Sequence, residues 1–389
     1  MSLQVQFLPA RQGDAIWVRW PGHQLLIDLG TEQTGRAFRE RLSALPADQR
    51  HFDLLVITHV DSDHIGGVLS CFADADEDLP GLSFDDVWFN GWEHLHGQQV
   101  APRRGTRVLE GMGPAQGERL ASWLRKQPWN EAFDRFPVTC TEDAPPTVRM
   151  PGGLALTVLG PTPSRLADLR QTWREEVEIA LARGSLSEAS SGLGPTAGRT
   201  LEAYGSSRPP ILETRVDLQL LAEATSRKDP SKTNATSITL LAEWEGRRIM
   251  LTGDAFADDL TEALTRLGDG EPVRLDLFKL PHHGSQQNLT RALVESVSCP
   301  SWIFSTDGST FHHPDAAAIA RLLNWGRQPQ PRFGFNVSSR YNRWWDNDDW
   351  RRLFGYEVEY GDDADGLTVS FEPIRPDNPS RVTGSGASR

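Results

Sequence analysis

Cysteine is scarce in this chain, and long apolar runs are missing. The 389 residues include three cysteines, Cys71, Cys140 and Cys299. Because they are odd in number and widely spaced, a disulfide framework is not expected, and none lies in the C-x-x-C pair of a cysteine-type zinc site. No window approaches the roughly 20 apolar residues of a membrane span. No basic segment followed by an apolar one marks a signal peptide after Met1. We therefore expect a cytoplasmic protein with no membrane partner.

An excess of positive charge is also missing. The chain has 40 Lys and Arg against 53 Asp and Glu, a net charge of −13. Proteins that bind nucleic acid without sequence preference usually carry a basic surface, so the composition counts against tight, sequence-blind duplex binding. It does not exclude a nuclease, because bound metal ions can supply the positive charge locally.

Predicted strands and helices alternate in two strand-rich parts of the chain. Apolar runs and turn residues predict strands over 3–8, 15–20, 24–29, 53–57 and 86–90, then over 237–244, 248–251, 275–280 and 302–305. Apolar residues at helical spacing predict helices over 31–45, 65–72, 256–267, 289–297 and 314–325.

The stretch between the two parts has a different composition. A helix is predicted from Ser164 to about residue 182, and residues 184–230 are rich in Gly, Ser, Arg and Pro. We interpret 164–232 as an insertion, helical at first and then partly disordered, within a single domain over 1–375. Residues 376–389 are predicted to be a flexible tail.

Four metal-ligand side chains fall within six positions directly after the apolar run 53–57. They are His59, Asp61, Asp63 and His64, followed by two glycines. Such a cluster at the end of a strand is suited to holding metal ions at a sheet edge. The alternative is a polar loop in which Asp61 or Asp63 caps the next helix.

Two further segments have the same form, a strand followed by ligand residues. The sequence RIMLTGDA at 248–255 ends with Asp254 at the strand tip, and FKLPHHGS at 278–285 carries His282 and His283. Two metal ions about 3.5–4 Å apart lower the pKa of a bridging water and clamp the reacting oxygens of an ester. A carboxylate at the position of Asp254 suits a bridging role, although it could also cap the following helix.

Taken together, these three segments are similar to the metallo-β-lactamase fold hydrolases. The subgroup they resemble most is the soluble hydrolase domain of the bacterial competence DNA-uptake channel. The resemblance covers roughly residues 1–75 and 232–325. It implies an α/β (α+β) fold, a four-layer αββα sandwich with the metal ions at the strand edges between its halves and the insertion joining the halves.

The resemblance also implies a division of the ligands between two ions. His59 and Asp61 would bind the first ion, Asp63 and His64 the second, and Asp254 would bridge them. His282 or His283 would complete the second site, with His282 preferred and the other histidine as its hydrogen-bonding neighbour. Asp28 would lie behind the site and orient the ligands.

This chain departs from the family pattern in two places. Asp61 stands where the commoner pattern has a third histidine, which makes the first site richer in oxygen and favours Mn²⁺ or Mg²⁺ beside Zn²⁺. The family's isolated histidine in the middle of the chain has no clear match. His94 and His96 are the candidates and His94 is preferred, although it could equally be an ordinary half-buried histidine.

Two groups near the C-terminal end could contact a substrate. His312 or His313 could protonate the leaving group or hold a phosphate, or both could be mere neighbours of the helix that follows Pro314. Residues 338–345 mix arginine with aromatic side chains. They could stack on the bases of a single strand or form a packed C-terminal cap.

The function that these observations predict is a dinuclear metal-dependent phosphodiesterase, a nuclease acting on DNA or RNA through a metal-bridged hydroxide. Its cofactors would be two divalent ions, Zn or Mn or else Mg, with Asp63 positioning the nucleophile. The alternatives are a hydrolase of a small molecule such as a lactone, thioester or cyclic nucleotide, and a non-catalytic interaction module. Stand-alone relatives resemble bacterial defence effectors, sometimes beside a protease, which would make 184–230 a candidate regulatory cleavage site and the protease a partner or activator.

Overall fold

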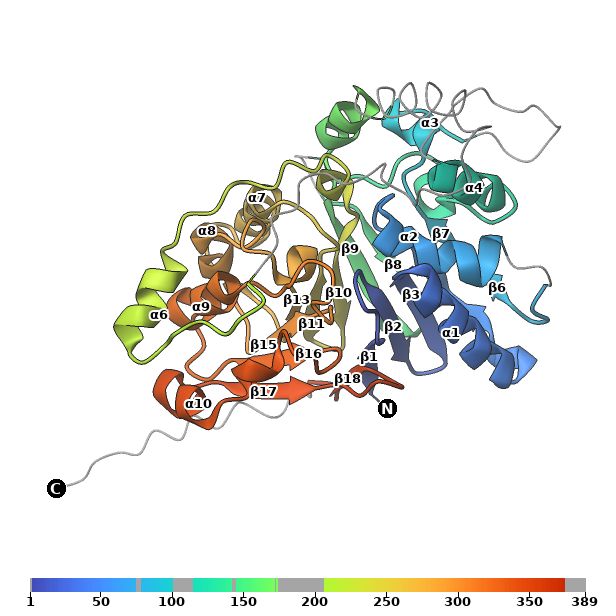
Figure 1. Ribbon diagram of the computed structural model, residues 1–389. Coiled ribbons are helices and arrows are strands. Elements are labelled where there is room, and N and C mark those ends of the chain that lie inside the picture. Colours follow the sequence, from blue (N-terminus) through green and yellow to red (C-terminus); the bar gives the residue numbers. More distant parts are fainter. Residues whose placement is uncertain are drawn as a thin grey trace, which may run out of the picture.

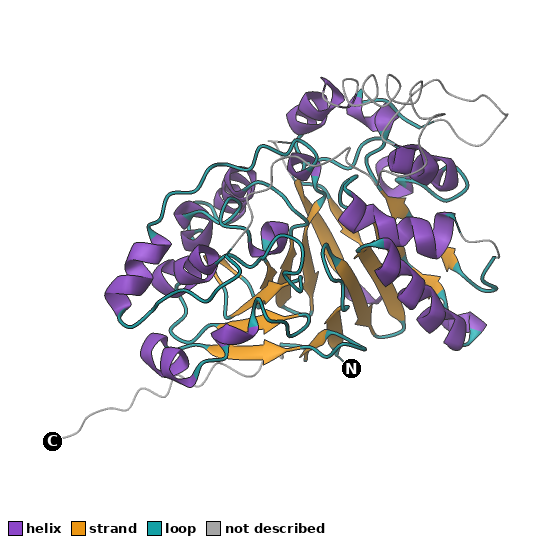
Figure 2. Ribbon diagram, in the orientation of Figure 1, coloured by secondary structure: helices purple, strands orange, loops and turns teal. Residues whose placement is uncertain are grey.

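The computed structural model of the chain describes residues 2–74, 78–100, 115–141, 145–171, 173 and 206–374. Two β-sheets lie face to face, and helices cover the outer face of each sheet (Figure 1 and Figure 2). This is the mixed α/β, four-layer αββα arrangement that the sequence predicts. The later part of the predicted insertion, 174–205, and the predicted tail, 376–389, lie outside the described residues.

The first sheet is built mainly from the N-terminal part of the chain. In spatial order its strands are β18 (Leu367–Phe371), β1 (Leu3–Phe7), β2 (Ala15–Trp20), β3 (His23–Leu29), β5 (Leu54–Val56) and β7 (Val87–Trp88). The first three neighbouring pairs are antiparallel, whereas β3, β5 and β7 run parallel. The predicted strands are confirmed, but β18 is a strand that the sequence analysis missed.

The second sheet has eight strands. In spatial order they are β17 (Glu357–Tyr360), β16 (Arg332–Phe335), β15 (Ser301–Phe304), β13 (Leu277–Lys279), β11 (Arg247–Leu251), β10 (Thr239–Trp244), β9 (Ala155–Gly160) and β8 (Thr147–Arg149). The strands from β17 to β11 are parallel, so their carboxyl ends meet at one edge of the sheet. Two small two-stranded sheets pair β4 (His51–Phe52) with β6 (Ser83–Phe84) and β12 (Val273–Arg274) with β14 (Val297–Ser298).

Helices cover both outer faces (Figure 1). On the side of the first sheet they are α1 (Glu32–Ala44), α2 (Ser62–Val68), α3 (Trp92–Leu95) and α4 (Ala115–Leu124). On the side of the second sheet they are α6 (Arg215–Ala222), α7 (Ala257–Leu267), α8 (Arg291–Glu295), α9 (Ala316–Trp325) and α10 (Asp348–Phe354). Residues 163–171 and 173 are also helical, as predicted from Ser164 onward.

Three apolar cores separate the four layers. Alternate residues of each strand face opposite sides of a sheet, so Ile249 and Leu277 join the core between the sheets, whereas Met250 and Phe278 join the core under the helices of the second sheet. A third core, which includes Phe38, lies between α1, α2 and the first sheet. The alternation also directs Lys279, two residues after Leu277, into the space between the two sheets.

Hydrogen bonds of one buried asparagine tie the two halves together. The side chain of Asn336 donates to the main-chain oxygens of Leu8 and Ala10 and accepts from the main-chain nitrogen of Thr306. The described part of the predicted insertion joins the second half. There, the guanidinium group of Arg321 donates to the main-chain oxygens of residue 222, the last residue of α6, and of residues 224, 286 and 289.

Candidate metal centre

The predicted ligand segments all leave the carboxyl ends of strands. His59 and Asp61 lie in the loop between β5 and α2, Asp63 and His64 lie in the first turn of α2, and Asp254 lies just after β11. The turn Pro281–Gly284 follows β13 and puts His282 and His283 in left-handed backbone conformations, with φ of 48° and 55°. Because β11 and β13 are parallel neighbours, their ligand loops emerge side by side and face the loop after β5.

Four side chains surround one position in this cluster. The Nε2 atoms of His64 and His283 each lie 3.3 Å from Oδ2 of Asp254, and Nε2 of His283 lies 3.7 Å from Oδ2 of Asp63. An ion bound tetrahedrally with bonds of about 2.1 Å separates its ligand atoms by about 3.4 Å. The spacing therefore fits the second predicted metal site, which we call the inner site.

A second position lies beside the first. Nε2 of His59 is 3.5 Å from Oδ2 of Asp61, and ligand atoms of His59, His64 and Asp254 lie within 4.8 Å of one another. The same Asp61 oxygen accepts a hydrogen bond of 2.9 Å from Oγ1 of Thr233. We call this position the outer site, because Asp61, which reaches it beside His59, has a side chain that retains 28% exposure. Among the described residues Asp61 belongs to no group of three ligand atoms within 4.8 Å of one another, so its place as a ligand depends on the contact with His59.

Buried nitrogen atoms without a hydrogen-bond partner support this assignment. The Nε2 atoms of His59, His64 and His283 are buried and accept or donate no hydrogen bond within the described residues. A buried polar atom normally has a partner, because leaving it unpaired costs about 1–3 kcal/mol. A divalent ion is bound by ligand atoms that have no other partner, and these three nitrogen atoms meet that requirement at the two positions.

The histidines and aspartates of the cluster strongly shift one another's pKa values. Burial alone would lower the pKa of His283, but the nearby carboxylates of Asp254, Asp14 and Asp63 outweigh it and raise the pKa to about 10. The pKa of His64 is also raised, since Asp254 and Asp28 overcome its burial. Burial would raise the pKa of Asp254, but these two histidines hold it well below its usual range. Metal binding requires both histidines to give up this proton.

Asp28 lies behind His64, in the place that the resemblance implies. Its Oδ2 accepts a hydrogen bond of 2.7 Å from Nδ1 of His64 and one of 2.6 Å from Oγ1 of Thr58. Oδ1 accepts from the main-chain nitrogen of Thr58 at 2.8 Å. This network fixes the ring of His64 so that Nε2 faces the inner site.

Lys279 and Asp14 belong to the centre, although the sequence analysis did not assign them to it. Both side chains are fully buried and form an ion pair. Nζ of Lys279 donates 2.9 Å to the main-chain oxygen of Gly253 and lies 3.8 Å from Oδ1 of Asp254. A lysine within the apolar strand Leu277–Lys279 was the available signal. Asp14 lies 3.5 Å from Nδ1 of His283.

The charge of the cluster matches two divalent ions. The residues concerned are the aspartates 14, 28, 61, 63 and 254 and the lysine 279. With neutral histidines, five carboxylates and one ammonium group give a net charge of −5 + 1 = −4. Two divalent ions would neutralise this charge, which a single ion would leave largely uncompensated.

The structure assigns the two adjacent histidines of the turn differently from the preferred expectation. His283, and not His282, lies against Asp254 and Asp63. Nδ1 of His282 instead contacts Oδ1 of Asn288 at 2.9 Å and Oδ2 of Asp229 at 3.2 Å. His282 is thus the hydrogen-bonding neighbour of the pair.

Asp229, from the predicted insertion, organises the surroundings of His282. Its carboxylate accepts hydrogen bonds of 2.9 Å from the amide nitrogens of Asn234 and Asn288. Asn288 in turn donates to the main-chain oxygens of Asp254 and Ala255. The end of the insertion therefore supports the loop that carries Asp254. Single side chains such as Asp229 and Thr233, far from the ligand motifs in sequence, gave no signal of this role.

His94 is not brought to the cluster. Its Nδ1 accepts from the main-chain nitrogen of Gly91 at 3.1 Å, and its Nε2 donates to the main-chain oxygen of Arg135 at 3.1 Å. Burial lowers the pKa of His94 to about 4. Both nitrogens are engaged in fixing α3, which is the structural alternative considered for this residue. His96 contacts Trp92 and also lies outside every described metal-ligand group.

His313 and His312 lie near the centre but point to different surroundings. His313 is buried, its ring centroid is 5.6 Å from that of His282, and neither ring nitrogen has a hydrogen-bond partner among the described residues. His312 has a left-handed backbone and stacks on Tyr341, with ring centroids 4.7 Å apart. Of the two, His313 is the one positioned beside the metal-ligand turn.

The arginine and aromatic segment 338–345 is mostly packed rather than open. Trp345 is fully buried, and its main-chain oxygen accepts a hydrogen bond from the hydroxyl group of Tyr356. Arg340 and Arg343 remain exposed. The packed C-terminal cap therefore accounts for the tryptophan, whereas the two arginines face solvent.

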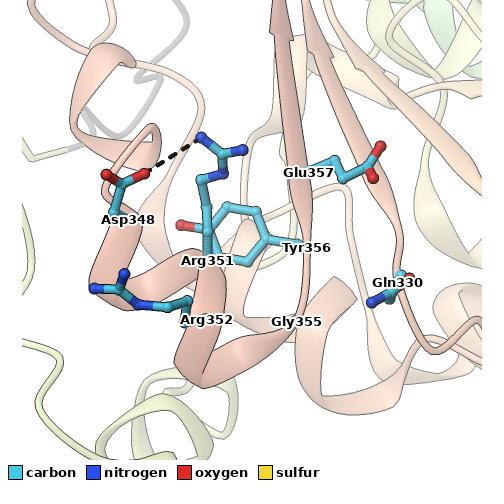
Figure 3. A pocket seen from close by; sticks show the side chains of 7 residues that line it. All are labelled: Gln330, Asp348, Arg351, Arg352, Gly355, Tyr356 and Glu357. Atoms are coloured by element: carbon cyan, nitrogen blue, oxygen red, sulfur yellow. Dashed lines mark ion pairs between the residues drawn. The ribbon is translucent and has the colours of Figure 1, made fainter.

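A hollow of about 370 Å³ on this cap is separate from the metal centre (Figure 3). Its lining residues are Gln330, Asp348, Arg351, Arg352, Gly355, Tyr356 and Glu357. Arg351 pairs with Asp346 at 2.8 Å and with Asp348 at 3.6 Å, and Arg352 pairs with Asp349 at 2.5 Å. Because these arginines are already paired, the hollow offers no free positive charge to a substrate.

Comparisons with known proteins agree with the architecture. The family model described as Metallo-beta-lactamase superfamily matches residues 8–76, the part that carries His59 to His64. Among curated proteins, no sequence matches the chain. No helix among the described residues is long and apolar enough to cross a membrane.

Three solved structures illustrate the similarity. The metallo-beta-lactamase fold protein YhfI from Bacillus subtilis is 10% identical, with a TM-score of 0.42, over 95% of this chain and 100% of that one. The metallo hydrolase Igni18 from Ignicoccus hospitalis is 11% identical, with a TM-score of 0.36, over 96% and 99%. CmlA, a diiron beta-hydroxylase from Streptomyces venezuelae, is 11% identical, with a TM-score of 0.40, over 95% of this chain and 54% of that chain.

The conclusion on the fold rests on the family match and on the arrangement of the two sheets. The matched segment includes β2, β3, β5 and α2 and contains the ligands from His59 to His64. The second sheet supplies Asp254 and His283 from its parallel edge. The described residues therefore form a mixed α/β, four-layer sandwich that is consistent with a metallo-β-lactamase fold, and residues 8–76 match the model of that superfamily.

Proposed function

We propose that this protein is a dinuclear metal-dependent phosphodiesterase that cleaves nucleic acid. The observation that carries the proposal is the convergence of six ligand side chains on two adjacent positions, in a cluster whose net charge is −4. When bound, two divalent ions lower the pKa of water and neutralise the charge that builds up on a reacting phosphate. The aspartate at position 61 makes the outer site rich in oxygen, which supports Mn²⁺ or Mg²⁺ beside Zn²⁺.

The side chains of the centre would divide the remaining work. Asp63 lies at the boundary of the inner site, 3.7 Å from His283, and its side chain keeps 19% exposure. Its Oδ2 atom can therefore remain a ligand of the inner site, while its other carboxylate oxygen accepts a proton from an attacking water molecule. Asp28 keeps His64 in place and excludes an alternative ring orientation.

His313 is our candidate for the group that protonates the leaving oxygen. It is buried without a hydrogen-bond partner for either ring nitrogen, at a ring distance of 5.6 Å from His282. A general acid accelerates departure of a poor leaving group such as a sugar alkoxide, but not of 4-nitrophenolate. His313→Asn should thus slow cleavage of a dinucleotide by about 10²-fold or more and leave hydrolysis of bis(4-nitrophenyl) phosphate nearly unchanged. Equal losses on both substrates would remove this role.

Support for a polynucleotide substrate comes from the arginine and aromatic residues next to His312, and not from the net charge of the chain. Arg340 and Arg343 are exposed, and Arg340 stacks over Tyr341, which in turn stacks on His312, the neighbour of His313. Aromatic and guanidinium groups of this kind contact single-stranded bases and phosphates. Arg351 and Arg352 do not contribute, because acidic neighbours neutralise them.

Hydrolysis of a small molecule is the second candidate function, and the net charge of −13 favours it. One experiment separates the two. The protein would be loaded in turn with Mn²⁺, Mg²⁺ and Zn²⁺ and assayed on single- and double-stranded DNA and RNA, and on lactone, thioester and cyclic nucleotide substrates. Asp254→Asn should abolish the activity, whereas Asp276→Asn, a carboxylate paired with Arg247 at the other end of β13, should keep it. Absence of nucleic-acid cleavage with every metal, alongside turnover of a small ester, would favour the second function.

The proposed biological setting is bacterial defence, with a protease as partner or activator. The first part of the candidate cleavage segment 184–230, up to residue 205, lies outside the described residues. Its described end reaches the metal centre through Asp229 and therefore links this segment to the site. Limited proteolysis with a trypsin-like enzyme, followed by intact mass and the nuclease assay, tests the idea. Cleavage at scattered positions with no change in activity would remove its support.

A further inference from the structure

We propose that the ammonium group of Lys279 is a built-in cation of the metal centre, occupying a third cation position beside the two metal sites. The proposal needs the metal centre but not the identity of the substrate. It concerns the oxygen atoms that surround Nζ: Oδ2 of Asp14, the main-chain oxygen of Gly253 and Oδ1 of Asp254.

These oxygens form a cation site in their own right. Ligand atoms of Asp14, Asp254 and His283 lie within 4.8 Å of one another and are buried, which makes them a candidate metal group. Carboxylate and carbonyl oxygens are the ligands that Mn²⁺, Mg²⁺ and Ca²⁺ prefer. The position is nevertheless filled, because the side chain of Lys279 enters it from β13, on the face between the two sheets.

Burial makes an incidental lysine improbable on energetic grounds. Lys279 is fully buried, and taking an ammonium group out of water is costly unless opposite charges compensate it. Asp14 provides that compensation from the loop between β1 and β2. The two residues come from different sheets, so the pair is assembled only where the metal-ligand loops meet.

The position of Lys279 also has a consequence for Asp254. Oδ1 of Asp254 lies on the side of the ammonium group, at 3.8 Å, whereas Oδ2 faces Nε2 of His64 and of His283 at 3.3 Å. The lysine thus keeps one oxygen of the bridging carboxylate away from a third ion. It also holds the net charge of the cluster at −4 rather than −5, which limits the metal content to two divalent ions.

A structural ion pair between the two halves is the simpler account of the same contact. Under that account, the number of bound metal ions would not depend on the lysine. If the ammonium group fills a cation position, its removal should open that position to a metal ion. Lys279→Met suits the test, because methionine keeps the apolar stem and is shorter by one heavy atom. It leaves a space beside three oxygens and an uncompensated carboxylate.

The experiment counts Mn²⁺ bound per chain. Wild type, Lys279→Met and the double variant Asp14→Asn with Lys279→Met would be stripped with a chelator, loaded with Mn²⁺ alone and desalted. Metal content would be measured by mass spectrometry, with Mn²⁺ electron paramagnetic resonance to detect spin coupling. We expect Lys279→Met to bind about one more ion per chain than wild type, with altered spin coupling. The double variant, which lacks the Asp14 charge, should return to the wild-type number.

Folding of the variants is part of the readout. Lys279→Met leaves Asp14 unpaired, so this variant could be unfolded without metal and recover its circular dichroism signal when Mn²⁺ is added, which would support the proposal. A folded Lys279→Met protein with the wild-type metal content would overturn it. Failure to fold in saturating Mn²⁺, while the double variant folds, would overturn it as well. A wild type that binds two Mn²⁺ ions and cleaves no nucleic acid would refute the proposed function and leave this test intact.

Discussion

Asp28 and His64 share a fully buried hydrogen bond of 2.7 Å that connects the end of β3 to α2. The carboxylate accepts from Nδ1 and thereby leaves Nε2 of the imidazole directed at Asp254, 3.3 Å away. Asp28 has a left-handed backbone, with φ of 51°, which most residues avoid. The chain therefore adopts an unfavourable local conformation at the place where this ligand is oriented.

Asp28→Asn should weaken metal binding at the inner site by about 10- to 100-fold, because the histidine loses the partner that fixes its tautomer and its ring orientation. Competition with a fluorescent chelator measures this change. Asp53→Asn is the matched control: Asp53 is also buried and accepts from Nδ1 of a histidine, His23, at 2.8 Å, but lies outside the centre. Equal effects of the two substitutions would show that the loss is one of general stability.

Asp61→His restores the third histidine of the commoner family pattern. Replacing a carboxylate by an imidazole makes the outer site richer in nitrogen, so its preference should move from Mn²⁺ toward Zn²⁺ by an order of magnitude or so. Titration with each ion, followed by metal analysis, gives the ratio of the two affinities. An unchanged ratio would mean that Asp61 is not a ligand and only receives the hydrogen bond from Thr233.

Thr233→Val removes the hydroxyl group that donates 2.9 Å to Asp61 and keeps the shape of the side chain. A hydrogen bond to a charged group contributes about 1.5–3 kcal/mol, so the outer ion should bind at least about tenfold more weakly. Thr233→Ser keeps the hydroxyl group and should retain the affinity. Isothermal titration with Mn²⁺ resolves the two sites, and a loss in the serine variant as large as in the valine variant would contradict this assignment.

Gly13 lies against the main chain of Asp63. A Cβ atom at Gly13 would be 1.6 Å from the main-chain oxygen of Asp63, and its φ of +80° is unfavourable for other residues. Gly13→Ala should displace Asp63 and reduce both metal affinity and catalytic activity. Gly22→Ala provides the control, because Gly22 has nearly the same φ, +79°, and open space around it.

The strain of an alanine at positive φ is about 1–2 kcal/mol and should appear in both glycine variants. Thermal unfolding measures this shared part. Only Gly13→Ala should show the additional loss of metal. Similar metal affinities for the two variants would mean that the contact with Asp63 tolerates the displacement.

His94 should make the fold sensitive to acid. Its pKa is lowered by burial from 6.5 to about 4, so the neutral ring is the form that the folded state accepts. The stability it contributes is present above pH 6.5 and is lost as the pH falls toward 4, by on the order of 2–3 kcal/mol. Urea unfolding between pH 7 and 4 measures this slope.

His94→Asn should flatten that slope, because the titrating ring is gone. His96→Asn, two residues away and half-buried, should leave the slope in place. Acid should destabilise the fold and not stabilise it, because a protonated Nδ1 atom of His94 can no longer accept the hydrogen bond from the main-chain nitrogen of Gly91. An identical pH profile in wild type and His94→Asn would contradict this account.

The elements that could be predicted are those with a strong local pattern. The run of His59, Asp61, Asp63 and His64 was visible because its ligands are adjacent in sequence, and the strands before it were marked by continuous apolar residues. The described helix α2 begins at Ser62, three residues earlier than predicted, because Asp61 takes an extended conformation suited to an N-cap. The strand β18 was missed, since its pairing with β1 joins the two ends of the chain.

The site residues that were missed depend on tertiary contacts. Asp14, Lys279, Asp229 and Thr233 act through partners far away in sequence, so their spacing contains no signal. The choice between His282 and His283 also required the backbone geometry of their turn, which directs one ring to Asp254 and the other to Asn288. Lys279 did leave a trace, a charged residue in an apolar strand.

The ligands of the centre are divided between two sheets that are far apart along the chain. Four of them precede residue 65, whereas Asp254 and His283 belong to loops of the second sheet. At a synthesis rate of about 5–20 residues per second, the second group leaves the ribosome on the order of tens of seconds after the first. During this interval the nascent chain exposes four ligand side chains that cannot yet enclose an ion. The two metal sites can therefore form only after the segment that carries His283 has been synthesised.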